Sequence, residues 1–112
     1  MVGNQEESAS KTARYGAKWS GTVNREGNEE EFNMDDLQIG SDGRLNGHGS
    51  DEAGEFKFEG IHGRGEVNCT QTFKNRKVIY YTGKINDELN EMKGNWSMQP
   101  GGNDGEFRLY KL

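Results

Sequence analysis

The chain contains very little cysteine and proline, and each shortage argues against a class of protein. Cys69 is the only cysteine among 112 residues, so no disulfide can form within the chain. Small secreted domains usually carry paired cysteines, so this composition favours the cytoplasm as the expected location. A disordered chain would have more than one proline and fewer than 10 % aromatic residues, so we expect a folded domain.

Long apolar runs and strongly basic segments are also missing. No apolar run approaches the ~20 residues that a membrane-spanning helix needs. The N-terminal residues are polar and lack the apolar segment of a secretory signal. The longest basic cluster runs from Lys74 to Lys77, and the formal net charge is −5. Neither a membrane nor a nucleic acid is therefore an expected partner.

Glycine is abundant, with 17 residues set among short runs in which apolar and polar residues alternate. Alternation with a period of two is typical of strands that bury one face. No sustained apolar stripe has the 3.6-residue period of a helix. The alternation predicts eight strands joined by short polar turns, over residues 15–23, 31–40, 44–49, 54–60, 66–73, 78–85, 91–98 and 106–112.

The second of these runs breaks the alternation. Met34 and Leu37 are both apolar, although their positions have opposite parity. One extra residue in the strand, a β-bulge, would return both side chains to the same face. We expect this bulge near Asp35 and Asp36.

Eight strands with one apolar face need a closed or layered arrangement. A single open sheet would leave two unpaired edges and a wet apolar face. Short connections favour hairpins, and closure of an eight-stranded meander removes both edges. We therefore expect an all-β fold, a single-domain eight-stranded antiparallel up-and-down β-barrel over residues 14–112, after a disordered tail over residues 1–13. A sandwich of two four-stranded sheets is the alternative.

The glycine-rich segment over residues 43–60 could hold a phosphate or form two strands and a turn. Phosphate-binding glycine loops lead into a helix. Here the segment continues into the alternating residues 54–60, which predict a strand. We therefore expect Gly47 and Gly49 to face inward and to permit strong coiling of the strand or close packing against a large ring of a neighbour.

Three sequence segments resemble calycin-type barrels, the group that contains avidins, fatty-acid-binding proteins and lipocalins. They are "AKWSGTV" near the start, and "VIYYTGKI" followed by "MKGNWSM". The resemblance covers residues 15–112 and is architectural, so no ligand-contacting residue of that group is carried over. It implies a barrel whose open end holds a small apolar or amphipathic ligand.

The large inward side chains have two interpretations. On the first, they fill the barrel. On the second, they form the wall of a pocket where the inward Gly47, Gly49 and Gly94 contribute no volume. On the second interpretation the candidate ligand-binding residues are Trp19, Phe32, Met34, Phe56, Phe58, Tyr81, Trp96 and Met98. We expect a non-enzymatic binding module for a small hydrophobic ligand at the barrel mouth. A filled barrel with a structural or protein-interaction role is the alternative.

The residues with reactive or metal-binding side chains form no recognisable set. His48, His62 and Cys69 are too few for a structural zinc site, and the acidic clusters do not match a calcium loop. Cys69 lies mid-strand on the apolar face, where burial would raise its pKa and prevent a nucleophilic role. We expect no catalytic residue, metal or cofactor. Tyr80 and Tyr110 face outward, where they would suit a homodimer contact.

Overall fold

The computed structural model describes residues 14–52, 54–98 and 104–112, and every regular element within them is a β-strand. The predicted tail over residues 1–13 lies outside the described residues. No helix in the described segments is long and apolar enough to cross a membrane. The strands are β1 (Arg14–Arg25), β2 (Asn28–Gly40), β3 (Arg44–Asp51), β4 (Gly54–Gly63), β5 (Glu66–Phe73), β6 (Val78–Ile85), β7 (Glu91–Met98) and β8 (Asp104–Lys111).

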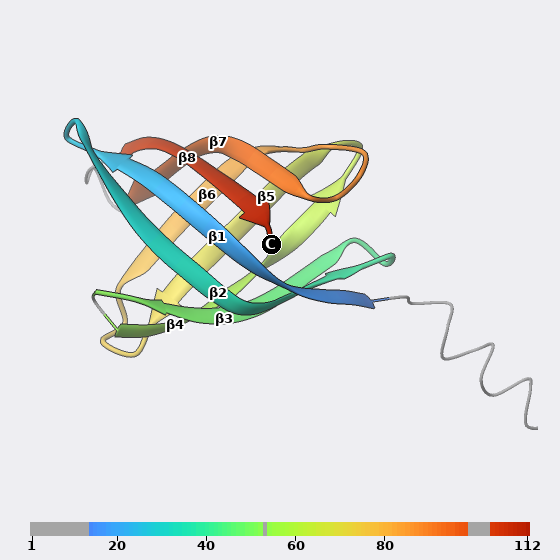
Figure 1. Cartoon of the computed structure of the whole chain (residues 1–112), viewed down its shortest axis with the longest axis horizontal. Helices are drawn as coiled ribbons and strands as arrows, with labels where there is room; N and C mark the ends of the chain where they lie inside the picture. The colour runs from blue at the N-terminus through green and yellow to red at the C-terminus, as the bar shows by residue number, and fades with distance from the viewer. Residues whose placement is uncertain (1–13, 53, 99–103) are drawn as a thin grey trace, which may run out of the picture.

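The strands form one closed antiparallel barrel in which each strand pairs with its neighbours in the chain (Figure 1). Closure is made by β1 and β8, where Trp19 lies opposite Lys111 and Val23 lies opposite Phe107. The predicted up-and-down barrel is therefore confirmed. The sandwich alternative is wrong, because the pairing of β1 with β8 leaves no sheet edge free.

The predicted bulge in β2 is confirmed. Trp19 lies opposite Met34, whereas Ala17 lies opposite Leu37, so β2 uses one more residue than β1 over this stretch. A matching register shift occurs against β3. Met34 and Leu37 are consequently both buried, although their positions have opposite parity.

Two of the hairpins have two-residue loops with both residues in the left-handed backbone region. In the β1–β2 turn, Glu26 has a φ of 53° and Gly27 a φ of 83°. In the β4–β5 turn, Arg64 has a φ of 55° and Gly65 a φ of 78°. Positive φ at both positions is the signature of type I′ turns, whose twist matches that of the adjoining strands.

The alternating turns define two ends of the barrel (Figure 1). We call the end with the β1–β2, β3–β4 and β5–β6 turns the Trp96 end, because the Trp96 indole N–H donates to the carbonyl oxygen of Asn24 at 3.1 Å, near the end of β1. We call the other end, with the β2–β3, β4–β5 and β6–β7 turns, the Trp19 end. Trp19 lies there opposite Lys111, the last residue of β8.

Aromatic rings meet in the middle of the barrel around Tyr81. The Tyr81 ring centre lies 5.0 Å from that of Phe107 and 5.4 Å from that of Phe58. Rings and aliphatic side chains from all eight strands thus occupy the interior. The buried apolar residues are Trp19, Val23, Phe32, Met34, Leu37, Ile39, Leu45, Phe56, Phe58, Val67, Cys69, Phe73, Ile79, Tyr81, Ile85, Met92, Trp96, Phe107 and Leu109.

Candidate functional site

The inward glycines allow neighbouring strands to approach closely. The adjacent strand then occupies the space that a larger side chain would need. A Cβ on Gly49 would overlap the carbonyl oxygen of Asn33, and a Cβ on Gly94 would overlap that of Thr82. Both obstacles are backbone atoms of the adjacent strand. The strands are therefore closely packed at Gly49, but the neighbour is the backbone of the adjacent strand and not the expected large ring.

The eight predicted ligand-binding residues do not converge on one open pocket. Seven of them are at most 4 % exposed, and Met98 is half-buried. Phe32, Phe56, Phe58 and Tyr81 are in ring-to-ring contact through the interior. These rings pack against one another, and Phe56 also borders a hollow on the outer face of the barrel.

The two tryptophans lie toward opposite ends of the barrel. Trp19 lies opposite Lys111 at the end of β8. Trp96 lies opposite Gly105 near the start of β8. A ligand at either mouth would therefore contact only one of the two indoles.

An apolar hollow of about 360 Å³ opens at the Trp19 end. The Trp19 ring is 1 % exposed and belongs to both the core and the hollow. Leu89 packs against the core from the β6–β7 turn and forms another part of the wall. The lining residues are Ala17, Trp19, Ile39, Glu88, Leu89 and Lys111. We call this hollow the Trp19 mouth.

The position of Leu89 depends on hydrogen bonds made by Asn86. The Asn86 side-chain oxygen accepts from the backbone N–H of Asn90 at 2.9 Å and from that of Glu91 at 3.0 Å. The Leu89 N–H in turn donates to the Asn86 carbonyl oxygen at 3.0 Å. Leu89 itself has a φ of 57°, an unusual value for a branched side chain. Sequence reasoning missed Leu89, although a lone leucine within the polar turn 86–90 was a signal.

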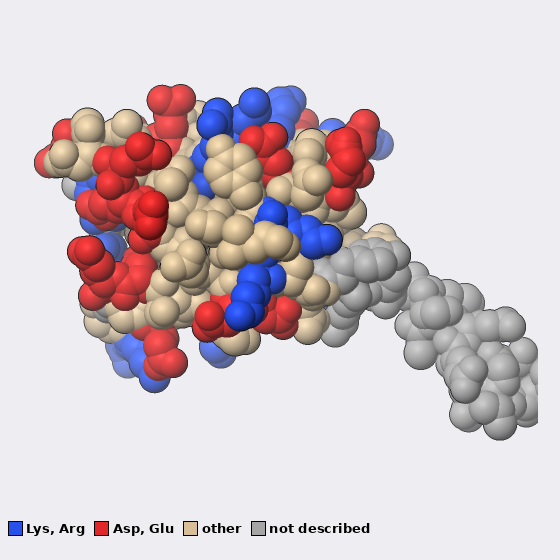
Figure 2. Space-filling model, in the orientation of Figure 1, with Lys and Arg blue, Asp and Glu red and all other residues tan. Residues whose placement is uncertain are grey.

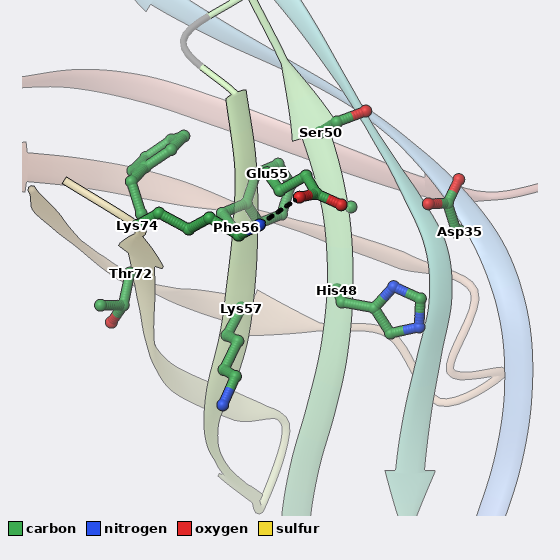
Figure 3. A pocket seen from close by; sticks show the side chains of 10 residues that line it. Asp35, His48, Ser50, Glu55, Phe56, Lys57, Thr72 and Lys74 are labelled. Atoms are coloured by element: carbon green, nitrogen blue, oxygen red, sulfur yellow. Dashed lines mark ion pairs between the residues drawn. The ribbon is translucent and has the colours of Figure 1, made fainter. Parts of the chain in front are cut away.

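A second hollow, of about 530 Å³, lies on the outer face of β2–β5 (Figure 3). His48, Lys57 and Thr72 lie directly opposite one another across β3, β4 and β5 on its floor. At one side the Lys74 ammonium lies 2.6 Å from a Glu55 carboxylate oxygen. This hydrogen-bonded ion pair lowers the pKa of Glu55 and raises that of Lys74. The outer hollow thus presents charges of both signs, and the His48 side chain is exposed within it.

The Trp96 end is polar, and cations cover its aromatic rings. The Arg25 guanidinium lies 5.1 Å from the Trp96 ring centre, and the Lys77 ammonium lies 5.5 Å from that of Phe73. Arg25 also approaches Glu30 at 3.8 Å. A hollow of about 430 Å³ lies there, lined by Arg25, Glu29, Glu30, Glu31, Asp51, Glu52 and Lys77. Among the described residues, no group of three or more His, Cys, Asp or Glu could hold a metal ion.

One polar side chain is buried in the interior. Gln71 is 1 % exposed, and its carbonyl oxygen accepts a 2.6 Å hydrogen bond from the Tyr81 hydroxyl. Its amide nitrogen has no hydrogen-bond partner among the described atoms. Desolvation is the main cause of the raised pKa of Tyr81, so the phenol stays protonated and donates.

Cys69 and His62 both lie in surroundings that suit a structural role. Cys69 is 4 % exposed, and burial raises its pKa to about 12. The sequence predicted that burial would shift this pKa upward. Such a thiol is uncharged at neutral pH and is a poor nucleophile. The His62 ring nitrogen Nε2 lies 2.7 Å from the carbonyl oxygen of Gly40. This contact links the end of β4 to the end of β2.

Comparisons with known proteins found no counterpart for this chain. No family model, no curated protein and no solved structure matches it.

Proposed function

We propose that this protein is a binding module for a small apolar or amphipathic molecule, held at the Trp19 mouth above a packed core. The observation that carries the proposal is the apolar hollow of about 360 Å³ between Trp19, Ile39 and Leu89. Small-molecule sites are concave and mostly apolar, with a few polar groups that orient the ligand. The hollow at the Trp96 end and the outer hollow are lined by more charged groups, so they suit such a ligand less well.

The rim of the Trp19 mouth suits a ligand with one charged end. Lys111 occupies an inward position on β8 and is exposed at the rim. Its ammonium would attract an anionic head group while the apolar body of the ligand contacts Trp19 and Leu89. Glu88 lies on the same rim and would disfavour a head group that sits next to the β6–β7 turn. A medium-chain fatty acid combines the required apolar body and anionic head.

The calycin-type resemblance supports the same location. Those barrels are expected to hold ligands at an open end, and the closed eight-stranded meander has the corresponding architecture. The support is by analogy of fold alone, which does not identify a ligand.

The second candidate function is a structural or protein-interaction barrel with a filled interior. The observation that favours it is the ring packing around Tyr81, together with two exposed apolar side chains on the outer face. Ile61 on β4 is 60 % exposed and Tyr80 on β6 is 36 % exposed. A homodimer contact is proposed on this candidate function, with Tyr80 near its centre.

Fluorescence titration with decanoate tests the proposed function. The Trp96→Phe variant retains Trp19 as its only tryptophan, so emission then reports the Trp19 mouth. We expect saturable quenching or a shift of emission in this variant. Adding Leu89→Glu should abolish the response, because a carboxylate would be placed in the apolar wall and would repel the anionic head.

The matched control is Ile61→Glu in the same Trp96→Phe background. It places the same charge on an exposed apolar position of the outer face, at a residue that does not line the mouth. The response to decanoate should survive this change. A response that is absent in the parent variant, or equally lost with both glutamates, would reject the Trp19 mouth as the site and favour the filled barrel.

A further inference from the structure

Three cationic side chains lie directly opposite one another on the outer face of β6, β7 and β8. Lys84 pairs with Lys93, and Lys93 pairs with Arg108. All three are exposed. We call these residues the cation row. Figure 2 shows Lys and Arg atoms gathered over β7 and β8, whereas Asp and Glu gather toward the Trp96 end.

The cation row lowers the stability of the barrel when no ligand is bound. Like charges directly opposite across strands destabilise a sheet. The chain has a formal net charge of −5, so acidic residues are plentiful. Two other exposed cations lie close to carboxylates: Lys74 to Glu55 at 2.6 Å and Arg44 to Asp42 at 4.0 Å. Within the described part of the chain, no ion pair within 4.0 Å is formed by any member of the cation row.

The carboxylates at paired positions on β5, β7 and β8 leave the centre of the row uncompensated. Glu66 lies opposite Lys84 on β5, at one end of the row. Glu91 lies opposite Tyr110, and Glu106 lies opposite Asn95, so both are displaced from Lys93 and Arg108 along the strands. The centre of the row, Lys93, has a cation on both neighbouring strands.

The Arg108 end of the row is ordered by Tyr110. The Arg108 guanidinium donates a 2.9 Å hydrogen bond to the Tyr110 hydroxyl and lies 5.8 Å from its ring centre. This contact uses no carboxylate. The charges of Glu91 and Glu29 also act on the guanidinium, but among the described residues neither carboxylate forms an ion pair with it within 4.0 Å. The hydrogen bond to Tyr110 also raises the pKa of Arg108.

We infer that the cation row is a binding site for a chain of linked phosphates. Neighbouring strands are ~4.8 Å apart, so three consecutive strands present a short line of closely spaced cations. A ligand whose negative charges follow one another along a chain can contact all three, whereas a single exposed ion pair contributes little. Binding would also remove the repulsion within the row. The site lies on the outer face and is independent of the Trp19 mouth.

Isothermal titration calorimetry with inorganic tripolyphosphate tests this inference on the full chain. We expect binding that weakens as salt is added, because exposed charges are screened. Lys93→Gln should weaken binding by about fivefold or more, equivalent to the loss of about 1 kcal/mol. Lys57→Gln, the matched control, removes one exposed positive charge from the outer face of β4 and should change the affinity less than twofold.

Thermal unfolding gives a second readout on the same proteins. Tripolyphosphate should raise the melting temperature of the wild type and of Lys57→Gln, and much less that of Lys93→Gln. Without ligand, Lys93→Gln should be at least as stable as the wild type, since repulsion is relieved. Adenosine triphosphate serves as a second probe: equal affinity indicates recognition of the phosphate chain alone, and tighter binding indicates an added contact to the nucleoside. No binding of either probe, or equal weakening by both glutamine variants, would overturn the inference.

Discussion

At the scale of the residue, small and polar side chains determine what the barrel interior can hold. Gly94 lies opposite Gly83 on β6, and the two strands approach until a Cβ on Gly94 would meet backbone. Gln71 and Tyr81 form a hydrogen bond in an otherwise apolar core. Burial of an amide is costly unless it is hydrogen-bonded, so this pair restricts how the surrounding rings can repack. The interior is thus arranged for close packing.

Gly94→Ala is expected to destabilise the protein by roughly 2 kcal/mol, because the added methyl group forces two backbones apart. Urea unfolding monitored by tryptophan emission measures this change. Gly63→Ala is the control, since a Cβ at Gly63 meets nothing within 4 Å and its φ is not in the left-handed region. An equal loss in both variants would mean that interstrand contact at Gly94 is not the cause.

At the scale of the element, the tight turns set the register of the hairpins. The β4–β5 hairpin places Gly63 opposite Glu66 across a two-residue loop, and both loop residues have positive φ. Arg64 carries a long side chain in this conformation, which costs free energy that asparagine largely avoids. The β4–β5 turn would therefore be more stable with asparagine than with arginine at position 64.

Arg64→Asn is expected to stabilise the protein by up to about 1 kcal/mol, because asparagine tolerates the left-handed region. The measurement is the urea midpoint compared with that of the wild type. Arg76 also has a positive φ, in the β5–β6 turn, so Arg76→Asn should act in the same direction. A lower midpoint for Arg64→Asn would show that the arginine side chain makes contacts that outweigh its backbone strain.

At the scale of the whole molecule, alternation along the chain was enough to predict the fold. The strand count, the antiparallel meander and the bulge between Met34 and Leu37 all follow from where apolar residues fall. Alternation does not reveal how far each strand is shifted against its neighbour. The placement of Trp19 and Trp96 toward opposite ends depends on that shift, so both were expected at one mouth.

The same limit explains the features that sequence reasoning missed. Lys84, Lys93 and Arg108 are separated in the chain, and only the strand register aligns them. Leu89 was assigned to a polar turn, because its contact with the core depends on how the β6–β7 turn folds back over the barrel end. The core was predictable from local pattern, whereas the candidate sites arise from the closure of the barrel.

Two-dimensional nuclear magnetic resonance of ¹⁵N-labelled protein tests the central claim, that a packed barrel binds its ligand at one mouth only. The spectrum contains one indole N–H signal from each tryptophan, and decanoate is added stepwise. We predict that the Trp19 indole signal moves and saturates, while the Trp96 signal stays in place. Movement of the Trp96 signal alone, or of neither signal, would contradict the account.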